Sequence, residues 1–158
     1  AFITAALAAG VDGLIIVDLP PEEDEELCDA ASAAGLSFIR LVTPTTLGSR
    51  LPVVVRKAGG FVYYVAIAGI TGTKSAATDS IRSAFLRLRE ETDLPAVAGF
   101  GIRSAEQAAE VAAIADGVVV GSALVQKIED AVESDKRSEL IKDVGSFCAS
   151  LSAAMQRG

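Results

Sequence analysis

The chain has 158 residues, 51% of them hydrophobic, which is enough for one domain with a buried core. A net charge of −7 with no visible basic stripe argues against a nucleic-acid partner, because the phosphate backbone would be repelled. Histidine is absent, which excludes a histidine-based catalytic triad or metal site and leaves carboxylates, tyrosine, lysine or backbone dipoles for any chemistry.

The first ten residues, AFITAALAAG, predict the end of a helix that stops at Gly10, just before a strand. They lack the basic residues that open a signal peptide, and Asp12 interrupts the apolar run long before it could span a bilayer. We therefore expect the chain to begin in the middle of a fold.

Five short apolar runs follow along the chain. They contain β-branched residues, and each is too short for a helix and too uniformly apolar for a half-exposed strand, which is typical of buried parallel strands. The runs are GLIIVDL from Gly13, SFIRLV from Ser37, FVYYVAI from Phe61, PAVAG from Pro95 and GVVVG from Gly117.

Helical patterns separate and follow these runs. Predicted helices cover Glu22 to Ala34, about Leu47 to Ala58, Ser80 to Glu91 and Ser104 to Ala113, and a last helix is marked by Leu140, Val144, Phe147, Leu151 and Met155. In the third of them Ile81, Ala84, Phe85 and Leu88 form one apolar stripe, which we expect to face the sheet.

The first of these helices opens with an acidic run, Glu22 to Glu26, which suits the positive end of the helix dipole, and Asp18 is expected to cap it. Cys28 and Cys148 belong to no C-x-x-C pair, and each falls in an amphipathic helix. We expect both to be reduced, core-facing thiols of a cytoplasmic protein.

Strands that alternate with helices predict a parallel sheet, for which two architectures compete. An open doubly wound sheet would be complete at this length. A (β/α)8 barrel needs about 250 residues, and five of its eight units would occupy roughly 156. The length and the start within a helix favour the barrel, so we expect residues 1–158 to form a single α/β domain of about the last five βα units.

Glycines follow three successive predicted strands, in AGITGTK, at Gly99 to Gly101, and at Gly121 before Ser122. Ser104 and Gln107 then form an S-x-x-Q capping box that starts a helix. Backbone N–H groups at such exits can form a cup for a phosphate at the carboxyl edge of the sheet. The alternative is a set of tight strand-to-helix connections without a ligand.

Five blocks stand in the order and spacing of the tryptophan synthase alpha chain: GVDGLIIVDLPPEE, LVTPTT, GFVYYVAIAGITGTK, AGFGIRSAEQ and DGVVVGSALVQKIE. The match runs from about Gly10 to Glu129, so the sequence resembles the C-terminal part of that family. The resemblance implies a (β/α)8 barrel and a lyase of tryptophan biosynthesis that cleaves indole-3-glycerol phosphate to indole and glyceraldehyde 3-phosphate. It also implies a beta chain partner, in an alpha2beta2 complex, that carries pyridoxal phosphate and receives the indole.

The same resemblance implies roles for individual residues. The residues implied to contact the phosphate are Gly72, Gly101, Gly121 and Ser122, and those implied to line the indole pocket are Phe100, Ile15 and Val17. Tyr63 is implied to lie beside the reacting substrate, and Thr71 to take part in closure of its loop over the site. Pro20 is implied to lie in the loop that faces the beta chain. No cofactor or metal is expected in this chain. By residue type alone, Phe100 could equally fill the core, Tyr63 could sit at the rim, and Ser122 could cap the following helix.

The glutamate and aspartate that perform acid–base catalysis in this family lie in its early strands and loops, before the part that the chain resembles. No residue here is therefore assigned either role, and we expect the segment to hold the phosphate and part of the indole pocket with little or no turnover. Free strand edges are also expected to favour self-association.

Two other functions remain open on the sequence. Another phosphate-binding barrel, such as a sugar-phosphate isomerase or epimerase, would share the glycine exits but not GITGTK with PTT upstream. A non-catalytic five-stranded segment could dock a partner without chemistry. Strand order separates an open sheet from a barrel, because barrel strands pair sequentially.

Overall fold

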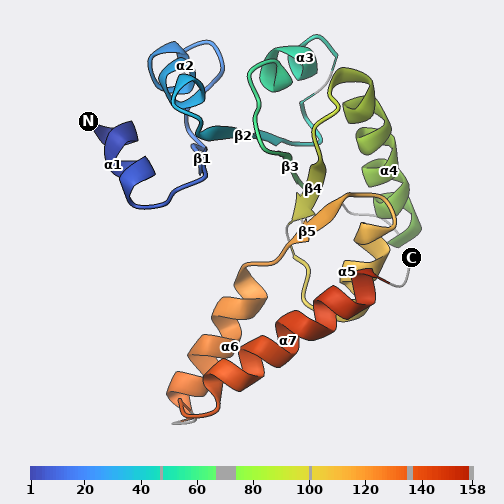
Figure 1. Ribbon diagram of the computed structural model, residues 1–158. Coiled ribbons are helices and arrows are strands. Elements are labelled where there is room, and N and C mark those ends of the chain that lie inside the picture. Colours follow the sequence, from blue (N-terminus) through green and yellow to red (C-terminus); the bar gives the residue numbers. More distant parts are fainter. Residues whose placement is uncertain (47, 67–73, 100, 135–136, 157–158) are drawn as a thin grey trace.

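The computed structural model describes residues 1–46, 48–66, 74–99, 101–134 and 137–156 (Figure 1). Helices and strands alternate along the chain as the sequence predicts. They are α1 (Phe2–Ala8), β1 (Gly13–Ile15), α2 (Glu25–Ala33), β2 (Ser37–Val42), α3 (Arg50–Val55), β3 (Val62–Val65), α4 (Lys74–Glu91), β4 (Ala96–Gly99), α5 (Ala105–Ala112), β5 (Gly117–Val119), α6 (Ser122–Glu133) and α7 (Leu140–Met155).

The strands form one parallel sheet in the order β1-β2-β3-β4-β5, so each strand pairs with the next one in the chain. An open doubly wound sheet would reverse its strand order at a switch point, whereas barrel strands pair sequentially. The expected partial barrel is therefore confirmed, and the open-sheet alternative is wrong.

The main core lies between the sheet and the helices α3 and α4. Val62 of β3 is fully buried there, with Phe85 and Leu88 of α4. Tyr64 packs edge-on against Phe85, with ring centres 5.4 Å apart. The apolar stripe predicted from Ile81 to Leu88 therefore faces the sheet. Because side chains alternate along a strand, Tyr63 lies on the opposite face of β3 from this core.

Two smaller cores extend the structure at either end. One lies beneath α1 and α2 and contains Phe38 and Cys28, and the other joins Ala108 of α5 to Leu151 of α7. Cys28 is buried as expected, but Cys148 is exposed and the prediction of a core-facing thiol is wrong there. On α7, Leu151 and its neighbours on the predicted stripe turn toward α5, which leaves position 148 on the solvent side.

Several element boundaries differ from the sequence expectations. Strand β1 spans only Gly13–Ile15, because the chain turns at Val17 and Asp18. The acidic helix begins at Glu25 with Asp24 at its N-cap position, so Asp18 is not its cap. The first helix ends as predicted, with Gly10 at a φ of +80°, where glycine avoids the strain of a side chain.

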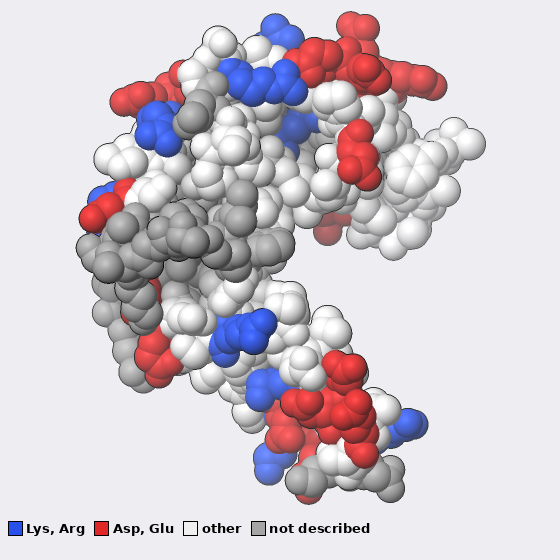
Figure 2. Space-filling view, turned by 180° about the vertical axis from the view of Figure 1, so that it is seen from behind, with Lys and Arg blue, Asp and Glu red and all other residues white. Residues whose placement is uncertain are grey.

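Seen from behind, the protein is an open crescent with a hollow on one side (Figure 2). On this face acidic side chains gather over the α2 end and over the tip formed by α6 and α7. Large apolar side chains are exposed at both ends, on β1 and just after it and on α6: Ile15, Val17, Val125, Ile128 and Val132. None of the helices within the described ranges is long and apolar enough to cross a membrane.

The amino edge of the sheet carries a carboxylate with a structural role. Asp116 precedes β5, and its Oδ2 accepts a hydrogen bond of 2.6 Å from the Ala96 N–H and pairs with Arg89 of α4. Burial alone would raise the pKa of Asp116, but the Ala96 amide and the Arg89 guanidinium outweigh it and hold this pKa below its usual value. Asp116 therefore ties α4 to two strands, at the edge away from the glycine exits.

We expect Asp116→Ala to lower the free energy of unfolding by about 1–2 kcal/mol at neutral pH, because the Ala96 amide and Arg89 lose a charged acceptor. The folded-state pKa is depressed, so this stabilisation is complete above about pH 4 and is lost as the pH falls through the folded-state pKa. Urea unfolding at neutral and acidic pH measures it, with the exposed Asp93→Ala as control. A loss of unfolding free energy in Asp116→Ala that is as large at acidic pH as at neutral pH would contradict this role.

Candidate functional site

Residues from three adjacent strands and the turns that follow two of them meet around one cavity of about 160 Å³. Tyr63 comes from β3, Gly101 and Ile102 follow β4, and the remaining lining residues lie at the end of β5 and the start of α6: Val119, Gly121 and Ser122. Tyr63, Gly101, Gly121 and Ser122 are all residues for which the sequence suggested a site. The structure thus brings together positions that span about sixty residues of sequence.

Gly101 leads from β4 toward helix α5. Its φ of +79° lies in the left-handed region, which strains any residue with a side chain. Three residues later, Ser104 caps α5 by accepting a hydrogen bond of 3.3 Å from the Gln107 N–H. Gln107 reaches back in turn, and its Oε1 accepts 2.7 Å from the Arg103 N–H. The Ser104 half of the predicted capping box is therefore present, and Gln107 bonds the amide one residue before the N-cap, which holds the turn behind Gly101.

Gly121 stands at the N-cap position of α6, so Ser122 is the first residue of that helix and not its cap. The Gly121 carbonyl accepts hydrogen bonds of 2.9 Å from Leu124 and 3.2 Å from Val125. The first N–H groups of a helix have no carbonyl partner within it, and they concentrate positive potential at this end. A helix start with a serine hydroxyl at the cavity is chemically suited to an anion.

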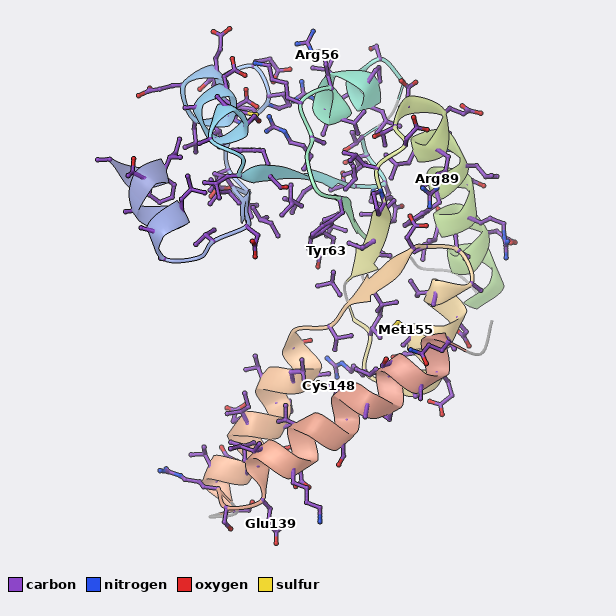
Figure 3. All side chains as sticks on the ribbon, viewed as in Figure 1. Arg56, Tyr63, Arg89, Glu139, Cys148 and Met155 are labelled. Carbon is purple, nitrogen blue, oxygen red and sulfur yellow. The ribbon has the colours of Figure 1, made fainter. Side chains whose placement is uncertain are left out.

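Tyr63 lies directly over Gly99 of the neighbouring strand. A Cβ atom built on Gly99 would come within 2.7 Å of Cε2 and 2.9 Å of Cζ of the Tyr63 ring, and would collide with its hydroxyl. The ring therefore occupies the space that a side chain at position 99 would need. Figure 3 shows Tyr63 on the inner side of the crescent, away from Arg89 on α4.

A second cavity of about 310 Å³ lies beside the first two strands. Val17 and Pro20 of the β1–α2 loop (residues 16–24) form one wall, and Leu41 and Thr46 contribute the other side. Arg50 of α3 also lines it and forms an ion pair with Glu22 of that loop. The hydrogen bonds from Arg50 lower the pKa of Glu22, so this carboxylate stays charged at neutral pH.

The loop after β2 is held by its own threonines. The Thr43 N–H donates 3.1 Å to Thr46 Oγ1, and the Thr46 N–H donates 2.9 Å to the Thr43 carbonyl. The hydroxyls of Thr43 and Thr45 are 2.8 Å apart. Thr43 and the PTT segment therefore form a closed turn held by threonine hydroxyls.

The remaining predicted residues divide into two groups. Phe100, Thr71 and Gly72 lie outside the described residues. Ile15 and Val17 are 44% and 72% exposed, and Val17 lines the second cavity and not the one that contains Tyr63. Sequence reasoning missed Ile102 and Val119, whose apolar type carries no signal beyond that of a core residue.

Within the described part of the chain, no acidic side chain lines the cavity that contains Tyr63. Asp18 lines the second cavity, and Asp116 lies at the opposite edge of the sheet. Among the residues that the structure describes, no group of three or more Cys, Asp and Glu side chains is arranged to hold a metal ion. The arrangement is chemically suited to an anion beside apolar side chains, and among the described residues that line it there is no carboxylate pair for acid–base chemistry.

The family described as tryptophan synthase alpha chain matches residues 1–156. The chain belongs to the tryptophan synthase alpha chain family. Tryptophan synthase subunit alpha from Legionella pneumophila str. Paris is 34% identical, with a TM-score of 0.85, and the match covers 99% of this chain and 56% of that one. Subunit alpha from Campylobacter jejuni is also 34% identical, with a TM-score of 0.77 over 81% of this chain and 52% of that one.

A third match is tryptophan synthase from Mycobacterium tuberculosis, at 34% identity and a TM-score of 0.80, covering 100% of this chain and 57% of that chain. The chain thus spans little more than half the length of the tryptophan synthase alpha chains it matches. The resemblance found in the sequence is confirmed, and the family match decides against a sugar-phosphate isomerase or epimerase.

We expect Gly99→Ala to lower the free energy of unfolding by about 1–3 kcal/mol, because the added methyl group displaces the Tyr63 ring or the strand. In a Tyr63→Ala background the same substitution should cost clearly less, since the space is then empty. Urea unfolding of the four proteins in this double-mutant cycle gives the coupling. Equal costs in both backgrounds would show that the contact is unimportant.

Proposed function

We propose that this chain is the phosphate- and indole-binding part of a tryptophan synthase alpha subunit, a carbon–carbon lyase that cleaves indole-3-glycerol phosphate to indole and glyceraldehyde 3-phosphate. The observation that carries the proposal is the meeting of Tyr63, Gly101, Gly121 and Ser122 around one cavity at the carboxyl edge of the sheet. Family membership supports the choice of substrate.

In this proposal the phosphate binds at the turn of Gly101 and at the start of α6. Glycine at both exits lets the backbone approach an anion closely, and the Ser122 hydroxyl adds a donor. Gly72 is assigned a further phosphate contact and Thr71 the closure of the loop over the ligand, both by resemblance to the family.

The indole ring is assigned to the apolar surface of β1 and the β1–α2 loop, which lies outside the cavity assigned to the phosphate. Ile15 and Val17 supply this surface from the first strand and its loop, and both are exposed and available for contact. Phe100 is assigned to the same pocket by family resemblance. Tyr63 lies between the two ends of such a ligand, with its hydroxyl on the inner side of the sheet.

Cleavage of indole-3-glycerol phosphate needs an acid to protonate the ring carbon and a base to accept a proton from the side-chain hydroxyl or the indole nitrogen. The site described above brings no carboxylate pair together. We therefore propose that the chain by itself binds the ligand with little or no turnover, and that turnover requires the family's glutamate and aspartate. An indole-release assay on the isolated chain checks this, and turnover near that of an intact alpha chain would contradict it.

The proposal includes a partner and a location. Pro20, on the β1–α2 loop, is assigned to the face that meets a pyridoxal-phosphate beta chain, and the chain itself is proposed to carry no cofactor. A biosynthetic role with free cysteines fits the cytoplasm.

The exposed apolar side chains on β1 and α6 also favour self-association of the chain. Light scattering over a concentration series measures this, and we expect the mean mass to rise with concentration. A monomer at all concentrations would contradict the prediction.

Calorimetric titration with indole-3-propanol phosphate, a substrate analogue that cannot be cleaved, tests the binding site. We expect saturable binding that Gly101→Asp weakens at least about tenfold, because a carboxylate beside the phosphate repels it. Gly35→Asp is the matched control, since Gly35 has a φ of +85° and open space around it but lies at the amino edge, before β2.

The outcomes separate clearly. Binding lost in Gly101→Asp and kept in Gly35→Asp supports the phosphate site. Equal loss in both variants would assign the effect to backbone strain, and a folded chain that does not bind at all would overturn the proposed function.

A further inference from the structure

A buried ion pair lies between the sheet and helix α2. Arg40 of β2 has a side chain only 4% exposed, and its Nη2 pairs with Oδ2 of Asp24, whose side chain is completely buried. The guanidinium lies 4.4 Å from the centre of the Phe38 ring, and its Nη2 is 3.5 Å from Sγ of Cys28. This is a charged contact within an otherwise apolar core beneath α2.

Burying the Arg40–Asp24 pair carries a desolvation cost that its hydrogen bonds do not fully offset. Arg40 Nε and Asp24 Oδ1 are both buried and lack a hydrogen-bond partner among the atoms that the structure describes. Buried pairs with unmet hydrogen bonds are often no more stabilising than apolar side chains of similar volume. A contribution to stability is therefore a weak explanation for this pair, and its position in the fold suggests another one.

Asp24 is the last residue of the β1–α2 loop, and Arg40 lies two residues before the end of β2. Loop residues from Ile16 to Pro21 form one wall of the 310 Å³ cavity, and Arg40 lines the same cavity from the strand. A turn closed by the Glu23 N–H, which donates 3.0 Å to the Pro20 carbonyl, stiffens the segment between them. The ion pair therefore fixes the end of the loop against the strand that faces it.

The cavity is poorly suited to binding an anion through its arginines. Arg40 is paired with Asp24 and Arg50 with Glu22, so each guanidinium already has a carboxylate partner. The apolar residues of the wall, which include Val17 and Pro20, are the surface that these ion pairs hold in place.

We propose that Arg40 is a positioning residue: its ion pair with Asp24 sets the β1–α2 loop, and the loop presents the apolar wall that contacts the indole part of the ligand. That the wall contacts an indole ring rests on the function proposed above. That the ion pair holds the loop in place does not depend on that function, and it can be measured without any ligand.

The test replaces both charges at once. Arg40→Met with Asp24→Leu removes the pair and leaves apolar side chains of similar volume, so the fold is expected to survive. The matched control is Lys57→Met with Asp29→Leu, which removes a partly exposed pair, 2.7 Å between Nζ and Oδ1, that also holds α2. Arg40→Lys is a third variant, which keeps the charge but lacks the planar fork of arginine.

The first readout is hydrogen exchange at the backbone amides of residues 16–19 and 22–24, since Pro20 and Pro21 have no amide hydrogen. We expect exchange there to rise about tenfold or more in the Arg40→Met, Asp24→Leu protein and to stay unchanged in β3 and β4 and in the control. The second readout compares two ligands. Affinity for indole-3-propanol phosphate should fall at least about fivefold, whereas affinity for glycerol 3-phosphate, which lacks the ring, should not change.

Wild-type exchange and an unchanged affinity ratio in the folded double variant would overturn the proposal. If that variant does not fold, Arg40→Lys decides, because the shorter ammonium should give intermediate exchange in the loop, and exchange equal to wild type would overturn the proposal. If the wild-type chain binds neither ligand, the proposed function fails, while exchange in residues 16–24 still tests the role of the ion pair.

Discussion

Parallel pairing in register is the constraint on which the rest of the structure depends. Val65 of β3 pairs with Gly99, and Gly99 pairs with Val119 of β5, so these three strands end at the same level. Each exit therefore starts from the same edge of the sheet, and Tyr63 reaches residues that are distant in sequence. The glycines act at this edge because a side chain at position 99 would collide with the tyrosine, and one at position 101 would be strained by the positive φ there.

The two edges of the sheet have different roles, as is general in barrel enzymes. At the amino edge, Asp116 joins a strand amide and an arginine of α4, and its consequence is stability. At the carboxyl edge, the turns leave backbone groups and a helix start around a cavity. The ion pair of Arg40 and Asp24 belongs to neither pattern, because it is buried beneath α2 and acts on a loop.

Much of the fold and part of the site could be predicted from the sequence because the signals are local. Apolar runs predicted the strands, the spacing from Ile81 to Leu88 predicted the buried face of α4, and Ser104 with Gln107 predicted the capping of α5. The sequence predicted that the acidic helix begins at Glu22, because Glu22 and Glu23 suit a helix start. In the structure the helix begins at Glu25, three residues later, because a turn between the Glu23 N–H and the Pro20 carbonyl precedes it. Contacts between distant residues, such as Tyr63 with Gly99 and Arg40 with Asp24, depend on strand register and helix docking, which residue type does not reveal.

The central claim is that the exits at Gly101 and Ser122 form one anion site. Titration of isotope-labelled chain with glycerol 3-phosphate, followed by backbone amide chemical shifts, tests it most directly. The account predicts concerted shifts at Gly101, Gly121 and Ser122 with a single dissociation constant, and none at Gly35 on the other edge of the sheet. Shifts confined to one exit, or spread equally over both edges, would contradict it.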